Sequence, residues 1–173
     1  EGVRRESRQP IYVVSIKSPI HNSNNIQIIV PPLAEFESNF RGWLTSINNL
    51  AKQISAKIVF NVLKDYQESF SNALIANNLK FKYQTDVYND WYSSFDTLSQ
   101  KSENSLIVAI SARKGSISHS SRIEIIPRLV SKKLKDKDFI IIYPAQPETT
   151  SIDTRAFLSG TGQVNIEEQG QIV

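Results

Sequence analysis

The chain has 173 residues, of which 40% are hydrophobic and 21% are charged, and its net charge is +3. This length and balance are typical of one globular domain with a terminal extension. Because the chain has no cysteine, we exclude disulfides, thiolate zinc sites and thiol catalysis, and because its only two histidines are far apart in sequence we do not expect a His-rich metal site. No apolar run approaches the ~18–20 residues of a membrane-spanning helix. The sequence also begins without methionine, so we expect it to be a piece of a larger protein.

The charge is distributed unevenly along the chain. Residues 144–173 contain four acidic residues and one arginine, so this segment carries −3 and the first 143 residues carry +6. Basic residues are concentrated at 4–8, at 113–114 and over 122–137, which we interpret as a basic terminus and a solvated helix face. Aromatic residues occur at helical core spacings rather than among these cations, so nucleic acid is not expected as a partner.

Apolar periodicity divides the chain into alternating strands and helices. The first predicted strand, at 26–30, ends at Pro31-Pro32 because proline cannot continue a ladder. Another strand-like run, at 11–16, precedes it. Asn77-Asn78 closes the second helix, and Pro127 suits the first turn of the fourth. The predicted elements are strands at 26–30, 57–62, 79–84, 105–110 and 139–143, separated by helices at 36–54, 66–74, 88–98 and 127–134.

This alternation, with nearly continuous apolar strands, predicts an α/β fold with a doubly wound, five-stranded parallel sheet. Right-handed crossovers favour the strand order 3-2-1-4-5. The fifth strand, 139–143, would then be an unprotected edge, so we expect the extra N-terminal strand at 11–16 to pair beside it. We divide the chain into a leader with this extra strand (1–24), an α/β domain (25–146) and a flexible polar tail (147–173).

Ligands of such sheets bind beyond the carboxyl ends of the strands, where the strand order reverses. Here that position receives the turn after the first strand and the polar loop 111–121, whose serines, glycine and cations suit a phosphate or another anion. The alternative is a surface loop that is polar because loops are polar. We expect Arg113→Glu to weaken anion binding and to leave the fold intact. The candidate anion or nucleotide site consists of Pro31, Pro32, Ser111, Arg113, Lys114, Gly115, Ser116 and Ser118.

No arrangement of residues indicates catalysis. The loop lacks the G-x-x-x-x-G-K-[ST] spacing of a P-loop, and no G-x-G-x-x-G follows the first strand. No serine has a G-x-S-x-G context, so a hydrolase that uses His119 as its base ranks lowest among our hypotheses. Glu35 and Glu37 would point about 200° apart around a helix and could not face one substrate, so we interpret them as charges that compensate the helix dipole. We expect no catalytic residue and no metal site.

Four segments carry a resemblance to a known family. The segments IIVPPLAEFESNFRGWL, SLIVAISARKGSISHSS, IIPRLV and FIIIYPAQ resemble the carboxyl-terminal cytosolic region of bacterial monovalent cation (Na⁺/K⁺)/proton antiporters, a region that is similar to universal stress proteins. The resemblance covers residues 11–146. It implies a regulatory or assembly domain that is not an enzyme, on the cytoplasmic side of a bacterial membrane, within a parent protein that is a secondary transporter. The implied partners are the membrane transport domain, a preceding stress-protein-like domain and a second copy in a homodimer. The strand at 11–16 would then be the last strand of that preceding domain.

The same resemblance bears on nucleotide binding. Nucleotide-binding stress proteins carry an Asp at the end of the first strand, where this chain has Val30-Pro31, and a G-x2-G-x9-G-[ST] motif after the fourth. The aligned motif positions hold Ser111, Lys114 and Glu124-Ile125, so every glycine is replaced, and a carboxylate at 124 would repel phosphates. Ordinary ATP binding is therefore not expected, although Gly115 leaves a non-standard site for an adenine nucleotide or a cyclic dinucleotide. The alternative function is that of a free-standing, universal-stress-protein-like nucleotide-binding protein.

Overall fold

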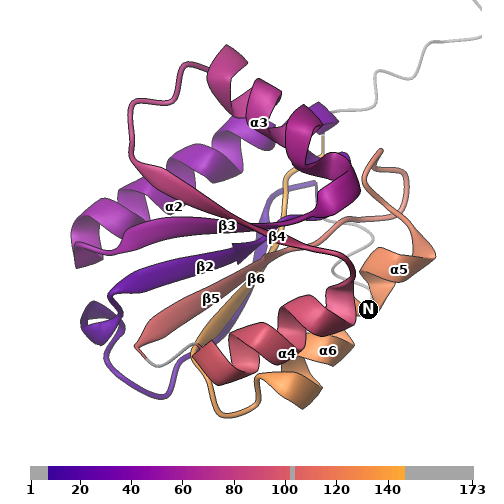
Figure 1. The fold of residues 1–173 in the computed structure, drawn as a ribbon. Coiled ribbons are helices and arrows are strands. Elements are labelled where there is room, and N and C mark those ends of the chain that lie inside the picture. The colour runs from indigo at the N-terminus through magenta and orange to yellow at the C-terminus, as the bar shows by residue number, and fades with distance from the viewer. Residues whose placement is uncertain (1–7, 102–103, 147–173) are drawn as a thin grey trace, which may run out of the picture.

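A computed structural model describes residues 8–101 and 104–146 of the chain. These residues form a mixed α/β fold with one six-stranded, mostly parallel sheet and helices on both of its faces (Figure 1). The predicted α/β class is therefore confirmed. The strands lie in the order β1-β6-β5-β2-β3-β4, and every neighbouring pair is parallel except β1 with β6. None of the helices in the described ranges has the length and apolar character that a membrane span requires.

The strands are buried according to their place in this sheet. β5 is buried along its whole length because it lies between β6 and β2 with helices on both faces. β4, at one edge, is largely exposed. The strands are β1 (Ile11–Ser15), β2 (Asn25–Ile29), β3 (Lys57–Leu63), β4 (Tyr83–Tyr88), β5 (Ser105–Ile110) and β6 (Phe139–Tyr143).

The helices form two layers, each with its own hydrophobic core against one face of the sheet (Figure 1). On the α2–α3 face, the ring of Phe70 packs edge to face with Phe60 at 5.2 Å and with Phe40 at 6.0 Å between centroids. On the other face, the buried Phe95 of α4 belongs to one core cluster with Ile123 of α5 and Ile126 of α6. The α-helices are α2 (Phe40–Ile54), α3 (Gln67–Ala76), α4 (Trp91–Lys101), α5 (Ser121–Glu124) and α6 (Ile126–Lys133), and the short 3-10 helices are η1 (Ile20–Asn22), η2 (Ala34–Phe36) and η3 (Lys64–Tyr66).

Helix α2 begins at Phe40 rather than at Phe36, where its apolar stripe predicts a start. The backbone of Leu33 is left-handed (φ 62°), and the 3-10 helix that follows ends at an extended Glu37. Phe36 is consequently 59% exposed and does not belong to the buried face of α2. The first turn of α2 contains no acidic residue, so the interpretation of Glu35 and Glu37 as dipole-compensating charges is wrong.

Strand β4 lies later in the chain than the predicted strand at 79–84. Pairing with β3 fixes its position, with Tyr88 opposite Leu63. Tyr88 therefore ends a strand instead of beginning a helix. Two apolar residues ahead of β4, Leu79 and Phe81, pack instead against the core of the α2–α3 face.

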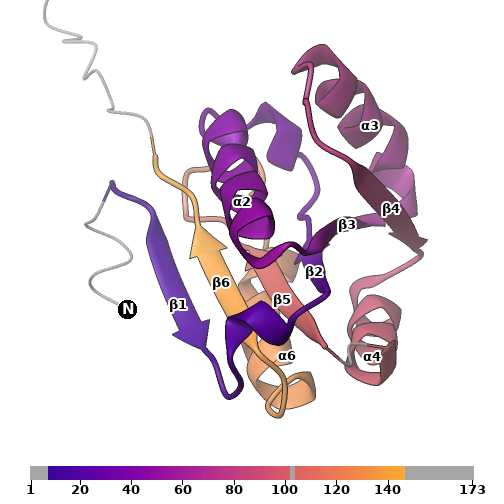
Figure 2. The ribbon, with the colours of Figure 1, turned by 90° about the vertical axis from the view of Figure 1, so that its left-hand side faces the viewer.

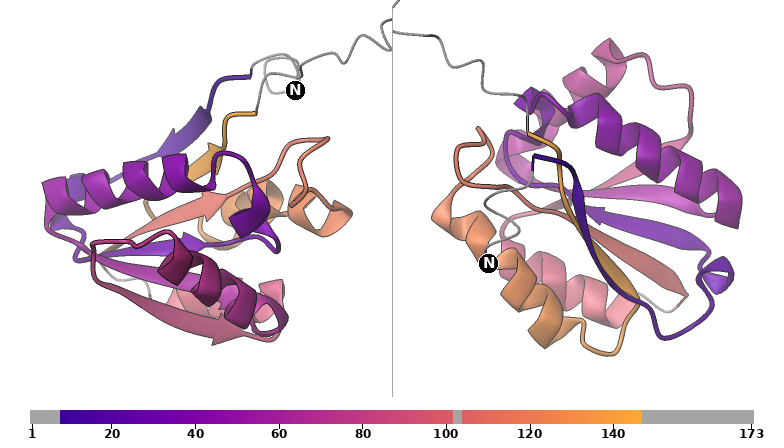
Figure 3. Two further views of the ribbon diagram at one scale, coloured as in Figure 1. Left: turned by 90° about the horizontal axis from the view of Figure 1, so that it is seen from above. Right: turned by 180° about the vertical axis from the view of Figure 1, so that it is seen from behind.

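Strand β1 lies beside β6, which confirms the prediction that the extra N-terminal strand covers this edge (Figures 2 and 3). The two strands are antiparallel, with Val13 opposite Ile141. Exposed apolar side chains remain on β1 itself, namely Tyr12, Val13 and Val14. The predicted division at residues 24 and 146 stays a prediction, and the predicted flexible tail (147–173) lies outside the described residues.

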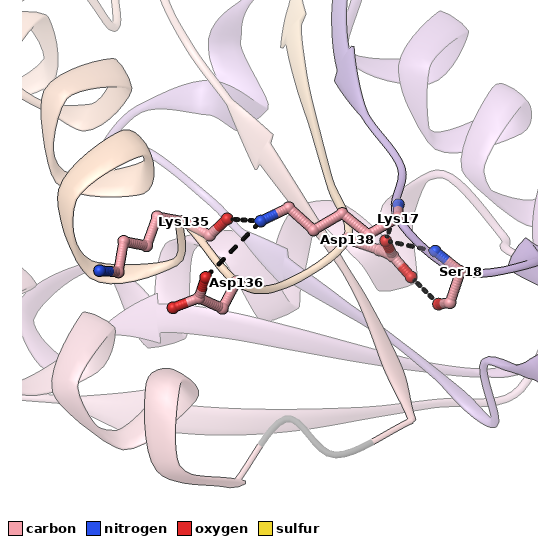
Figure 4. A network of polar contacts seen from close by, with 5 residues as sticks. All are labelled: Lys17, Ser18, Lys135, Asp136 and Asp138. Atoms are coloured by element: carbon pink, nitrogen blue, oxygen red, sulfur yellow. Dashed lines mark hydrogen bonds and ion pairs between the residues drawn. The ribbon is translucent and has the colours of Figure 1, made fainter.

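The connection that follows β1 is held by Asp138, which directly precedes β6 (Figure 4). This buried carboxylate accepts hydrogen bonds from the backbone N–H groups of Lys17 (2.5 Å) and Ser18 (3.3 Å) and from the Ser18 hydroxyl. The Lys17 ammonium donates to the Lys135 carbonyl and lies 3.7 Å from the Asp136 carboxylate. Burial alone would raise the pKa of Asp138, but the hydrogen bonds and the Lys17 charge outweigh it and lower that pKa below its ordinary value.

We expect Asp138→Asn to reduce the free energy of unfolding by about 1 kcal/mol at neutral pH, because the amide keeps an acceptor oxygen but loses the charge. The folded pKa lies below the unfolded value of ~3.9, so the carboxylate stabilises the fold above that pH and its contribution disappears as the pH falls through the folded pKa. Urea unfolding measured against pH should therefore show a steeper acid loss in the wild type than in the variant. Asp136→Asn, at an exposed carboxylate, is the matched control, with an expected change within about 0.5 kcal/mol. Equal losses in both variants would contradict this role for Asp138.

Candidate functional site

A cleft with a volume of about 750 Å³ lies at the carboxyl ends of the parallel strands. The turn after β2, the 3-10 helix after β3, the turn after β4 and the loop after β5 form its walls. This is where parallel α/β sheets bind their ligands, because the connecting loops converge there. The structure therefore has a cleft at the end of the sheet where the sequence predicts a site.

The walls of the cleft are aromatic and acidic. The aromatic rings and carboxylates that line it are those of Tyr66, Trp91, Tyr92, Asp65 and Asp90, and the imidazole of His119 lines it as well. Of the described residues that line it, none is a lysine or an arginine. The Asp90 carboxylate accepts a hydrogen bond from the backbone N–H of Ser93 (2.9 Å), which lowers the pKa of Asp90 and keeps the group ionised at neutral pH. A cleft with this charge accommodates a neutral or cationic aromatic ligand better than a polyphosphate.

The eight predicted site residues do not converge on this cleft. Two of them line it, Pro32 and Ser118. The others are buried (Pro31, Ser111 and Arg113), half-buried (Ser116) or exposed (Lys114 and Gly115). Gly115 has a φ of 89°, which favours glycine, so its place in the loop is explained by the turn rather than by a ligand.

Arg113 connects the loop by hydrogen bonds to the segments before β1 and at the end of β6. Its side chain is 6% exposed and donates hydrogen bonds to the main-chain carbonyls of Gln9 and Tyr143. Burial lowers the pKa of Arg113 below that of a solvated guanidinium. This position does not support the predicted role of Arg113 as an anion ligand.

The loop at residues 111–121, called the serine loop below, has two hydrogen-bond donors that already bind a carboxylate of the chain itself. Oε1 of Glu37 accepts hydrogen bonds from the backbone N–H of Ser118 (2.8 Å) and from its hydroxyl (2.6 Å). A backbone N–H and a hydroxyl aimed at one oxygen are what such a loop would offer to a phosphate. The loop therefore has an internal anion, with which any external anion must compete.

The sequence did not reveal this role of Glu37, because Ser118 lies 81 positions away. The available signal is topological: β2 and β5 are neighbours, so the segments that follow them meet. Glu35 accepts a hydrogen bond from the Ser69 hydroxyl (2.5 Å). The two glutamates thus bind different segments, in agreement with the prediction that they do not face one substrate.

The histidine of the loop pairs with a carboxylate. Nε2 of His119 lies 3.1 Å from Oε1 of Glu124 in α5, whereas the neighbouring Ser118 hydroxyl donates to Glu37. Ser118 and His119 therefore form no nucleophile–base pair. Within residues 8–101 and 104–146, no three potential metal ligands come together as a metal site would require.

No protein-family model, curated protein or solved structure gave a significant match when compared with the chain.

Proposed function

We propose that the chain is a regulatory or assembly domain of a bacterial membrane cation/proton antiporter, located on the cytoplasmic side and without catalysis of its own. The proposal starts from the resemblance of residues 11–146 to the universal-stress-protein-like region of such antiporters. The five parallel strands follow one another as β4-β3-β2-β5-β6. This arrangement agrees with the order 3-2-1-4-5 and supports a stress-protein-like unit.

The observation that carries the proposal is the antiparallel strand β1 on β6. A strand ahead of an α/β unit is expected where that unit follows another domain of the same kind, because the last strand of the first domain can cover the edge of the second. The exposed residues Tyr12, Val13 and Val14 leave an apolar outer edge on β1. The other strands of a preceding domain would continue the sheet there, and a homodimer is the second way to cover such an edge.

The reading frame of the parent gene tests this proposal. We expect it to encode on the order of a dozen hydrophobic spans of ~20 residues upstream of Glu1. We also expect a stress-protein-like segment between those spans and Glu1. A start codon immediately before Glu1 would overturn the proposal.

A free-standing nucleotide-binding protein is the alternative function, and the cleft is the observation that favours it. Its volume of about 750 Å³ and its aromatic walls suit an adenine ring. Glu37 and the cleft carboxylates oppose the phosphates, so we expect no saturable binding of ATP at micromolar concentrations. Calorimetry with ATP, AMP and cyclic dinucleotides separates the two functions, because micromolar ATP binding would favour the alternative.

A further inference from the structure

A second groove, of about 830 Å³, lies at the amino ends of β3 and β4, at the opposite end of the sheet from the cleft. The end of α2, the start of β3 and the segment that enters β4 surround it, and these elements are on the left-hand side of Figure 1. Four exposed lysines line this basic groove: Lys52, Lys57, Lys80 and Lys82. Among the described residues, none that lines the groove is acidic and none forms an ion pair with any of the four lysines. Their mutual repulsion favours an anionic occupant.

The basic groove borders a sheet edge that can accept an extended peptide. β4 is the outermost strand of the described sheet, so the backbone groups on its outer side have no strand partner among the described residues. Phe81 and Tyr83 alternate with the lysines at this edge and add apolar surface to the groove. A segment that combines acidic and apolar residues could therefore extend the sheet and neutralise the lysines together.

We propose that the acidic segment 147–173 of the same chain docks in the basic groove. The segment carries −3 overall, and its acidic pair Glu167 and Glu168 would face the four lysines of the groove. Its acidic residues are Glu148, Asp153, Glu167 and Glu168, its one basic residue is Arg155, and the apolar residues next to the acidic pair are Val164 and Ile166. This inference does not depend on the proposed function, because it rests only on the charge of the groove and of the segment.

The segment is long enough to make this contact. The described chain ends at Gln146, shortly after β6, and the carboxyl end of β6 lies at the opposite end of the sheet from the basic groove because β6, β5, β2 and β3 run parallel. A domain of this size has a diameter of roughly 40 Å. Residues 147–166, fully extended, span up to about 65 Å, so Glu167 and Glu168 can reach the lysines. The tether provides an effective concentration on the order of millimolar, so individually weak ion pairs suffice.

Paramagnetic broadening in the full chain tests the docking. Because the chain has no cysteine, Gln171→Cys provides a single site for a nitroxide label. We expect the backbone amide signals at the start of β4 to lose most of their intensity at about 0.02 M salt and to recover at about 0.5 M salt, where the ion pairs are screened. Broadening elsewhere on the domain, or none at low salt, would overturn the proposal.

Charge-reversed variants identify the groups responsible. The double variant Lys80→Glu/Lys82→Glu should lose the broadening, and adding Glu167→Lys/Glu168→Lys should restore it. Lys132→Glu/Lys135→Glu is the matched control, because it makes the same charge change at one exposed lysine within α6 and one just after it, and it should keep the broadening. Broadening that survives Lys80→Glu/Lys82→Glu would contradict the proposal. Broadening seen only between molecules, in a mixture of spin-labelled and isotope-labelled chains, would assign the groove to a second copy and overturn docking within one chain.

Discussion

Replacing Arg113 by glutamate should destabilise the protein by about 3–5 kcal/mol, although the residue belongs to a polar loop. The guanidinium is buried and donates to the carbonyls of Gln9 and Tyr143. A glutamate in its place would direct a buried carboxylate at carbonyl oxygens and would supply no donor to them. The structure thus corrects the expectation from the sequence that this charge reversal leaves the fold intact.

Lys114→Glu is the matched control for this experiment, since it makes the same charge change at the next, exposed position. We expect its free energy of unfolding to stay within about 0.5 kcal/mol of the wild type. The measurement is the urea midpoint of unfolding by circular dichroism, with the m-value checked for each variant. If both variants unfold at the same urea concentration, Arg113 does not have the structural role assigned to it.

The central strands could be predicted because their sequences match their environment. SLIVAI in β5 and FIIIY in β6 are short apolar runs between polar residues, as expected for strands covered on both faces. β4 could not be located in this way, because YQTDVY mixes polar and apolar residues at an exposed edge. The run LKFKYQ just before it alternates more regularly, but pairing with β3 places the strand later.

The candidate site could be predicted only in its position. The turn after β2 and the loop after β5 meet because those strands are neighbours, and this follows from the topology. The sequence could not distinguish Arg113 from Lys114, because adjacent residues of like charge differ here only in the side of the loop that they face. The structure buries Arg113 and leaves Lys114 in solvent. The carboxylates of the cleft were also missed, because they come from the segments after β3 and β4 rather than from the predicted loops.

Glu37→Ala should lower the free energy of unfolding by about 2–3 kcal/mol, because it removes the acceptor of two charge-assisted hydrogen bonds from a buried serine. The freed N–H and hydroxyl of Ser118 then form an anion site that the wild type lacks. Inorganic phosphate at ten times its dissociation constant should restore about 1.4 kcal/mol. The measurement is the midpoint of thermal unfolding as phosphate is titrated.

Comparison with a second glutamate separates specific rescue from the general stabilisation that phosphate gives to folded proteins. Glu35 lies two positions before Glu37 in the sequence. Glu35→Ala removes the acceptor of the Ser69 hydroxyl and leaves the hydrogen bonds of Ser118 in place. Phosphate should therefore raise the unfolding midpoint of Glu37→Ala more than that of Glu35→Ala or the wild type. Equal increases in all three proteins would mean that the Ser118 donors do not bind an anion. A specific rescue would show instead that the loop keeps the geometry of an anion site and that the Glu37 carboxylate occupies it.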